Sequence, residues 1–181
     1  MKTKRIYYLI LFFCSLLFTA GSCEKDNEPQ LPPITQTGKD SFGCLVNGEI
    51  WLPEPTIAFP AIPKISAELK REGNYRIWKL GASQGASSSF YFGIYEDSLK
   101  EGKINIPVDE LNDVGLYFFS KKFEKASFTW DKKLQGELII AKLDTVNMIL
   151  SGTFWFDAVN MLNETIKIRD GRFDFKIDQI Q

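Results

Sequence analysis

Residues 42–52 read Phe-Gly-Cys-Leu-Val-Asn-Gly-Glu-Ile-Trp-Leu, two apolar runs joined by an Asn-Gly dipeptide. Asn and Gly tolerate the positive φ angles of a type I′ turn, which connects two antiparallel strands most tightly. A turn at this dipeptide pairs Val46 with Glu49, Leu45 with Ile50, and Cys44 with Trp51. Because apolar side chains fall on both faces, we expect the hairpin to be covered on both sides or to lie near the core. Cys44 is then a small buried hydrophobe.

The same period of two continues to the end of the chain. Further runs with strand character cover residues 64–71, 75–83, 88–97, 103–108, 114–120, 126–131, 136–144, 147–159, 164–170 and 172–178. The last run alternates Phe173, Phe175 and Ile177 with Arg172, Asp174 and Lys176, which predicts one buried and one solvated face. No amphipathic helix reaches three turns. The pattern predicts one all-β domain, an antiparallel β-sandwich or flattened barrel of about ten strands.

The first 22 residues have the pattern of a secretory signal helix. Residues 2–5 are Lys-Thr-Lys-Arg, and residues 6–20 contain 13 apolar residues and no charge. At ~1.5 Å per residue the apolar run spans about 22 Å, short of the ~30 Å hydrocarbon core of a bilayer. A cleaved export signal is therefore favoured over a transmembrane helix.

Ala20-Gly21-Ser22-Cys23 resembles the lipobox that the lipoprotein signal peptidase cuts, so Cys23 is predicted to be acylated and to anchor the chain. The alternative is an ordinary thiol beside a plain signal-peptidase site.

Residues 24–28 (Glu-Lys-Asp-Asn-Glu) resemble the surface-export signal of Bacteroidota lipoproteins; the alternative is a solvated tether. Three prolines lie in residues 24–41, so residues 23–41 are predicted to form a flexible, disordered tether before a domain of residues 42–181.

The charged and sulfur-containing residues exclude several functions. The chain has no histidine, three cysteines and a formal net charge of -1. Removing residues 1–22 takes away three basic residues and Cys14, which leaves 19 basic against 23 acidic residues, a charge of -4. Histidine-dependent nucleophiles and zinc sites are excluded, and a nucleic-acid partner is disfavoured. With Cys23 acylated, Cys44 is the only remaining thiol, so no intrachain disulfide can form.

Three stretches together resemble a family of Bacteroidota lipoproteins classed as a domain of unknown function: residues 42–54, 143–160 and 166–177. The resemblance spans the whole body. It implies the localisation and the fold, and it implies no reaction, cofactor or catalytic residue.

Acidic residues are the only candidates for catalysis or metal binding. A calcium loop or a two-carboxylate glycosidase needs several oxygens or two acids at one place. The candidates are Asp109, Glu110 and Asp113 for a metal, and Glu96, Asp97, Glu101, Asp157 and Glu164 for catalysis. Their spacing shows no metal or catalytic motif, so we expect no metal, no cofactor and no enzymatic activity.

Aromatic residues are the candidates for ligand binding. In residues 153–159, Phe154 and Phe156 share one face and Trp155 shares the other with Thr153 and Asp157. If the Phe face is the core, Trp155 points outward, where an indole can stack on a sugar. Trp130, Tyr91 and Tyr95 are further candidates. The alternative is that all four cover the second face of a sandwich.

Two tripeptides, Asp97-Ser98-Leu99 and Asp144-Thr145-Val146, resemble a short O-glycosylation acceptor of exported bacterial proteins, which makes Ser98 and Thr145 candidate acceptors.

Taken together, the sequence predicts a lipid-anchored, surface-facing outer-membrane protein that acts by binding or as a passive envelope component. Its expected partners are the membrane and either a glycan or another envelope protein. The alternatives are a carbohydrate-binding accessory protein that uses outward aromatics and, less favoured, a small carboxylate hydrolase.

Overall fold

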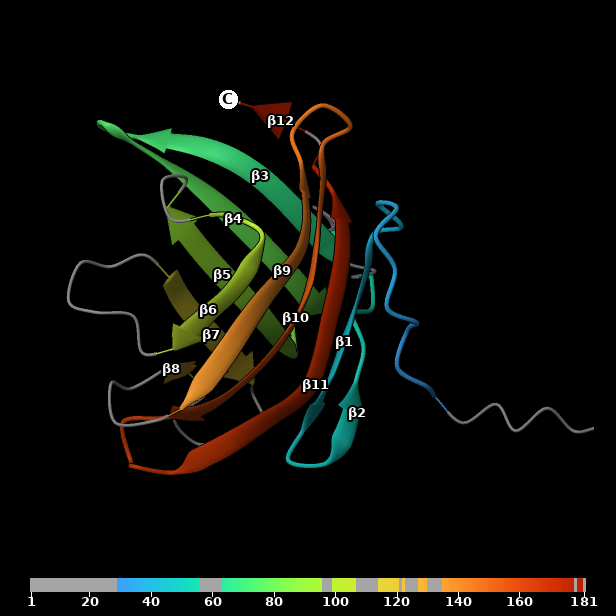
Figure 1. Cartoon of the computed structure of the whole chain (residues 1–181). Helices are drawn as coiled ribbons and strands as arrows, with labels where there is room; N and C mark the ends of the chain where they lie inside the picture. Colours follow the sequence, from blue (N-terminus) through green and yellow to red (C-terminus); the bar gives the residue numbers. More distant parts are fainter. Residues whose placement is uncertain are drawn as a thin grey trace, which may run out of the picture.

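A computed structural model describes residues 29–55, 63–95, 99–106, 114–120, 122, 127–129, 135–177 and 179–180 of the chain. This part contains twelve strands and no helix (Figure 1). The strands are β1 (Ser41–Val46), β2 (Glu49–Trp51), β3 (Ile65–Glu72), β4 (Tyr75–Gln84), β5 (Ser88–Tyr95), β6 (Gly102–Ile106), β7 (Val114–Ser120), β8 (Ser127–Thr129), β9 (Gly136–Asp144), β10 (Ile149–Val159), β11 (Thr165–Lys176) and β12 (Gln179–Ile180). The prediction of an all-β chain is confirmed.

The strands form two layers that pack face to face as a β-sandwich (Figure 1). The first layer has the order β12-β3-β4-β5-β7-β8 and the second has the order β6-β9-β10-β11-β1-β2. All pairs are antiparallel except the short parallel pair of β12 with β3. β8 pairs with both β7 and β10, so hydrogen bonds continue from one layer to the other. Among the described strands no pairing closes the sheet into a barrel, so the sandwich alternative holds.

The β1–β2 hairpin has the register that its sequence predicts. Cys44 pairs with Trp51, Leu45 with Ile50, and Val46 with Glu49. Asn47 and Gly48 have φ angles of 52° and 88°, as a type I′ turn requires. A second hairpin joins β3 and β4, the predicted runs 64–71 and 75–83, where Glu72 pairs with Tyr75 around Gly73-Asn74.

Phenylalanine side chains hold the two layers together. The rings of Phe42 on β1 and Phe90 on β5 lie 5.4 Å apart, and those of Phe92 on β5 and Phe154 on β10 lie 4.9 Å apart. Trp51 contributes a polar link between layers, since its Nε1 donates to Ser88 Oγ at 2.8 Å. Cys44 is fully buried among these rings, and burial raises the pKa of its thiol. Cys44 is therefore core filling, as predicted.

Residues 31–40, which we call the N-terminal strap, differ from the expectation of a flexible tether. They lie on the outer face of β1 and β11 (Figure 1). A Cβ on Gly43 would meet Pro32 Cδ at 2.7 Å, so the glycine allows this close approach. Asp174, which was expected on a solvated face, is 1% exposed because the strap covers it. It accepts hydrogen bonds from Thr35 Oγ1 at 2.6 Å and from the amides of Thr37, Gly38 and Lys39 at 3.0, 2.8 and 3.3 Å.

Candidate binding groove on the second layer

A β-bulge in β11 shapes the outer face of the second layer. Phe154 pairs with Gly171 and Phe156 pairs with Ile168, so Arg169 and Asp170 together face the single residue Trp155. Asp170 takes a positive φ of 51° at this bulge. Such bulges re-aim side chains and bend the strand. Here Arg169 and Arg172 both project outward, separated by two residues instead of one.

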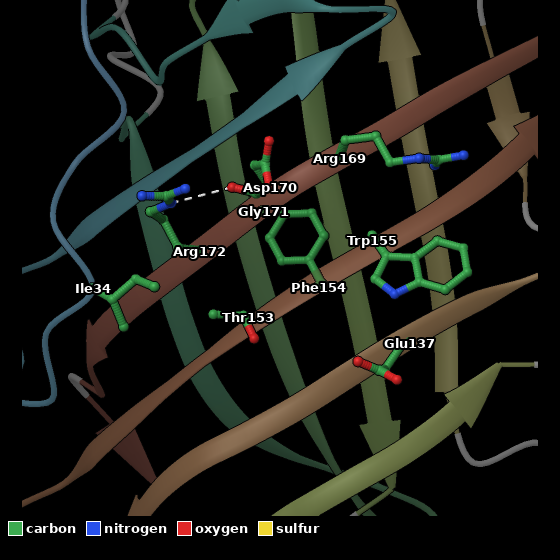
Figure 2. A pocket seen from close by; sticks show the side chains of 9 residues that line it. All are labelled: Ile34, Glu137, Thr153, Phe154, Trp155, Arg169, Asp170, Gly171 and Arg172. Atoms are coloured by element: carbon green, nitrogen blue, oxygen red, sulfur yellow. Dashed lines mark hydrogen bonds between the residues drawn. The ribbon is translucent and has the colours of Figure 1, made fainter.

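A groove of about 500 Å³ lies over this bulge, which we call the outer groove. The side chains that line it come from β9, β10, β11 and the strap: Glu137, Thr153, Phe154, Trp155, Arg169, Asp170, Arg172 and Ile34 (Figure 2). Gly171 also borders it. A Cβ there would meet the Phe154 ring at 2.5 Å, so the ring packs directly against bare backbone.

Trp155 is held in place by charged neighbours. It is half-buried, and its cross-strand partner on β9 is Glu137. The guanidinium carbon of Arg169 lies 5.2 Å from the centre of the indole, a cation–π contact. Arg169 is itself fixed, since its Nη2 lies 2.6 Å from Asp157 Oδ1 and its Nη1 donates to Ile168 O at 2.8 Å. The indole therefore has a preformed orientation on a rigid strand.

The acids beside Trp155 are already paired with cations. Glu137 forms an ion pair with Lys103 of β6, and Asp157 forms one with Arg169. A carboxylate that has one oxygen beside a cation keeps lone pairs that can accept further hydrogen bonds. Of the two acids, Glu137 lines the outer groove, where it can accept hydrogen bonds from a bound ligand.

Arg172 differs from Arg169 in its partners. Its Nε donates to Asp170 O at 3.2 Å and its Nη1 donates to Pro32 O at 3.3 Å (Figure 2 shows the first contact). Both acceptors are neutral carbonyl oxygens. Within the described part of the chain, no carboxylate forms an ion pair with Arg172. Arg172 thus places a guanidinium without an ion-pair partner at the strap end of the groove, which the exposed Asp170 also lines.

The predicted aromatic residues do not form one patch. Trp155 points outward, as its parity predicts, while Phe154 and Phe156 are buried. Tyr91 and Tyr95 lie on the outer face of β5 in the first layer, on the opposite side of the sandwich, and Tyr91 is 37% exposed. Trp130 lies outside the described residues. A single ligand site made of Trp155 and the two tyrosines is therefore not formed.

The acids proposed for catalysis are scattered. Glu101 accepts the Leu143 amide at 2.9 Å, and Glu164 accepts Asn160 Nδ2 at 2.6 Å in the β10–β11 turn. Asp157 binds Arg169. The other candidates (Glu96, Asp97, Asp109, Glu110 and Asp113) lie outside the described residues. Among the residues that are described, no three acidic or cysteine side chains gather as metal ligands would.

Two modification candidates also lie outside the described residues, namely Cys23 and Ser98. Thr145 is described and is exposed in the β9–β10 turn. Asp144 holds that turn by accepting the amides of Val146 and Asn147 at 3.1 and 2.8 Å. Thr145 is therefore accessible to a modifying enzyme, and its glycosylation stays a prediction.

Four groove residues were not predicted from the sequence: Arg169, Arg172, Glu137 and Ile34. One signal was present: the buried positions change from even numbers (Ile166, Ile168) to odd numbers (Phe173, Phe175) along β11. A change of parity within one strand indicates a bulge, and Asp170-Gly171 stands where the change occurs. Nothing local in the sequence indicates that Ile34 lies beside the groove.

Comparison of the chain with protein-family models, curated proteins and solved structures finds no match. In the part of the chain that the structure describes, no helix is long and apolar enough to cross a membrane. The fold and the groove define a β-sandwich with a mixed aromatic and charged site on one outer face.

Proposed function

We propose that the protein is a lipid-anchored, surface-facing outer-membrane module that binds carbohydrate without catalysis. The anchor is supported by the signal pattern of residues 1–22 and by the lipobox-like residues that end at Cys23. The surface location is supported by the charged residues 24–28, which resemble a surface-export signal. The resemblance of the body to Bacteroidota lipoproteins agrees with both.

The outer groove is the observation that carries the binding function. Trp155 supplies an indole face, and Thr153, Glu137 and Arg169 supply hydroxyl, carboxylate and guanidinium groups around it. Sugars present apolar C–H faces that stack on aromatic rings and hydroxyls that need both donors and acceptors. The paired state of Glu137 and Asp157 favours binding over hydrolysis.

The anchor would hold the sandwich close to the membrane. The strap packs on the sheet from Leu31, so seven residues lie between Cys23 and the packed part of the chain. At ~3.4 Å per residue this spacer reaches at most about 24 Å. The protein would therefore bind its ligand close to the membrane surface.

A second candidate function is interaction with another envelope protein. The β10–β11 turn exposes Met161 (87%) and Leu162 (45%). Asn160 fixes this turn by accepting the amides of Leu162 and Glu164 at 3.0 and 2.9 Å. Two apolar side chains on a fixed turn suit a protein contact. Serine at both positions should abolish cross-linking to such a partner and leave carbohydrate binding unchanged.

The anchor is tested by fractionation of cells that express the full chain. Cys23→Ala should move the protein out of the membrane fraction, because acyl chains supply the membrane affinity. Cys44→Ala is the matched control and should fractionate as the wild type does, since its thiol is buried in the core. Unchanged fractionation of Cys23→Ala would refute the anchor.

Carbohydrate binding is tested by affinity electrophoresis of the full chain, extracted in mild detergent, through gels that contain neutral or acidic soluble polysaccharides. We expect retardation by at least one polysaccharide and its loss in Trp155→Ala. Tyr91→Ala removes an exposed aromatic from the opposite outer face and should leave the retardation intact. Equal loss in both variants, or no retardation of the wild type, would contradict this function.

A further inference from the structure

We propose that the outer groove selects sugars that bear a carboxylate, with Arg172 as the residue that binds the carboxylate. This inference rests on the proposed carbohydrate-binding function and adds the chemical class of the ligand. The two arginines that border the groove, Arg169 and Arg172, differ in their binding partners.

Arg169 already has binding partners within the protein. Its guanidinium lies 2.6 Å from Asp157 Oδ1, it donates to Phe156 O and Ile168 O at 3.2 and 2.8 Å, and it covers the indole of Trp155. Its charge is compensated and most of its donors are used. Arg169 therefore positions Trp155 and is not the group that selects an anion.

Arg172 is held by the protein without being neutralised. Its contacts to Asp170 O and Pro32 O use two of the five N–H donors of a guanidinium. These contacts fix the plane of the group, and its remaining donors keep the fork geometry that matches a carboxylate. A fixed guanidinium loses little side-chain entropy when it binds an anion.

The spacing along β10 fits one sugar residue. Thr153 pairs with Arg172 across β10 and β11, and Trp155 is the next outward residue on β10. Outward neighbours on a strand are about 6.5 to 7 Å apart. A pyranose ring that stacks on Trp155 can therefore extend a carboxylate past Thr153 to Arg172.

The other charges of the groove agree with an anionic ligand. Glu137 is neutralised by Lys103, so it adds no uncompensated negative charge beside Trp155. Asp170 also lines the groove; its side chain is exposed, and Figure 2 shows its carboxylate directed away from Thr153. Ile34 of the strap lines the groove at the Arg172 end, beside the position proposed for the carboxylate of the ligand.

The test is a calorimetric titration of the full chain in mild detergent with three acidic probes: oligogalacturonate, hyaluronan fragments and sialyllactose. Each probe is compared with its carboxyl-reduced form, which keeps the hydroxyls and loses the charge. We expect at least one acidic probe to bind, its reduced form to bind tenfold or more weakly, and added salt to weaken the acidic complex.

Substitutions on β11 distinguish binding by Arg172 from nonspecific electrostatic attraction. Arg172→Gln should lower the affinity for the acidic probe by about tenfold or more, and Arg172→Lys should lower it less because the charge stays while the fork is lost. Lys167→Gln removes the same charge from an exposed position on β11 and should change the affinity less than twofold. Arg172→Lys also covers the case in which the glutamine variant fails to fold.

The inference is overturned if no acidic probe binds, if the reduced forms bind as well, or if Lys167→Gln costs as much as Arg172→Gln. Trp155-dependent retardation by neutral polysaccharides alone would overturn the carboxylate selectivity and leave the proposed function standing. Failure of both neutral and acidic carbohydrates to bind would remove the proposed function as well.

Discussion

Asp174 fixes the N-terminal strap through a cluster of hydrogen bonds that joins residues about 136 positions apart in the chain. Burial acts to raise the pKa of this carboxyl group. The hydrogen bonds from Thr35, Thr37, Gly38 and Lys39 outweigh burial and hold the pKa below its ordinary value. The folded protein therefore stabilises the ionised form.

Asp174→Asn should lower the free energy of unfolding by about 2 to 4 kcal/mol, because the charge-assisted bonds are lost and one oxygen becomes an amide donor facing donors. Chemical denaturation measures this difference. Asp170→Asn is the control on the same strand. Its side chain is exposed and asparagine tolerates the positive φ at that position, so it should change stability by less than about 0.5 kcal/mol.

The same residue makes stability depend on pH. Since the folded pKa of Asp174 lies below its ordinary value of 3.8, its contribution is complete above that value and is lost as the pH falls through the lowered folded pKa. Melting curves between about pH 6 and pH 2 should show the gap between wild type and Asp174→Asn closing in acid. A gap that stays constant over this range would contradict the assignment.

At the scale of elements, the β1–β2 hairpin is joined to β11 by its turn. Asn47 donates its amide to Lys167 O at 2.9 Å, and its Oδ1 accepts the Lys167 amide at 2.9 Å. The turn residue thus has two roles, since it adopts a φ of 52° and it extends the pairing of β1 with β11.

Two substitutions separate these roles. Asn47→Gly keeps the positive φ and loses the side-chain bond, which should cost about 1 kcal/mol. Asn47→Ala loses the bond and also strains the backbone, so it should cost about 1 kcal/mol more. Unfolding by denaturant measures both. If the two variants are equally stable, the turn geometry contributes nothing to the hairpin.

Structural features that depend on neighbouring residues in the sequence could be predicted. The Asn-Gly dipeptide and a period of two determined the register of β1 with β2 and the outward direction of Trp155. The groove was not predictable, because it depends on the bulge at Asp170 and on side chains from three strands and the strap. Asp174 also lies within a cleanly alternating run, and nothing near it reveals that a distant segment covers it.

At the scale of the whole molecule, the strap connects the N-terminal segment of the chain with the outer groove. It begins at Leu31, eight residues after Cys23, covers Asp174 and ends beside the start of β1, where Asp40 Oδ1 accepts the Lys176 amide at 2.9 Å. Within the strap, Ile34 borders the outer groove, and the carbonyl oxygen of Pro32 accepts a hydrogen bond from Arg172. The sandwich and its site therefore include residues 31–40.

Comparing a chain of residues 29–181 with one of residues 41–181 tests this extension of the domain. Removing the strap exposes Asp174 and discards its hydrogen bonds, so the shorter chain should lose about 2 to 4 kcal/mol and melt about 5 to 15 °C lower. Asp174→Asn should destabilise the longer chain and leave the shorter one nearly unchanged, because the two changes remove the same interaction. Differential scanning calorimetry of the four proteins measures the coupling. If Asp174→Asn costs as much in the shorter chain, then Asp174 stabilises the sandwich through contacts other than the strap.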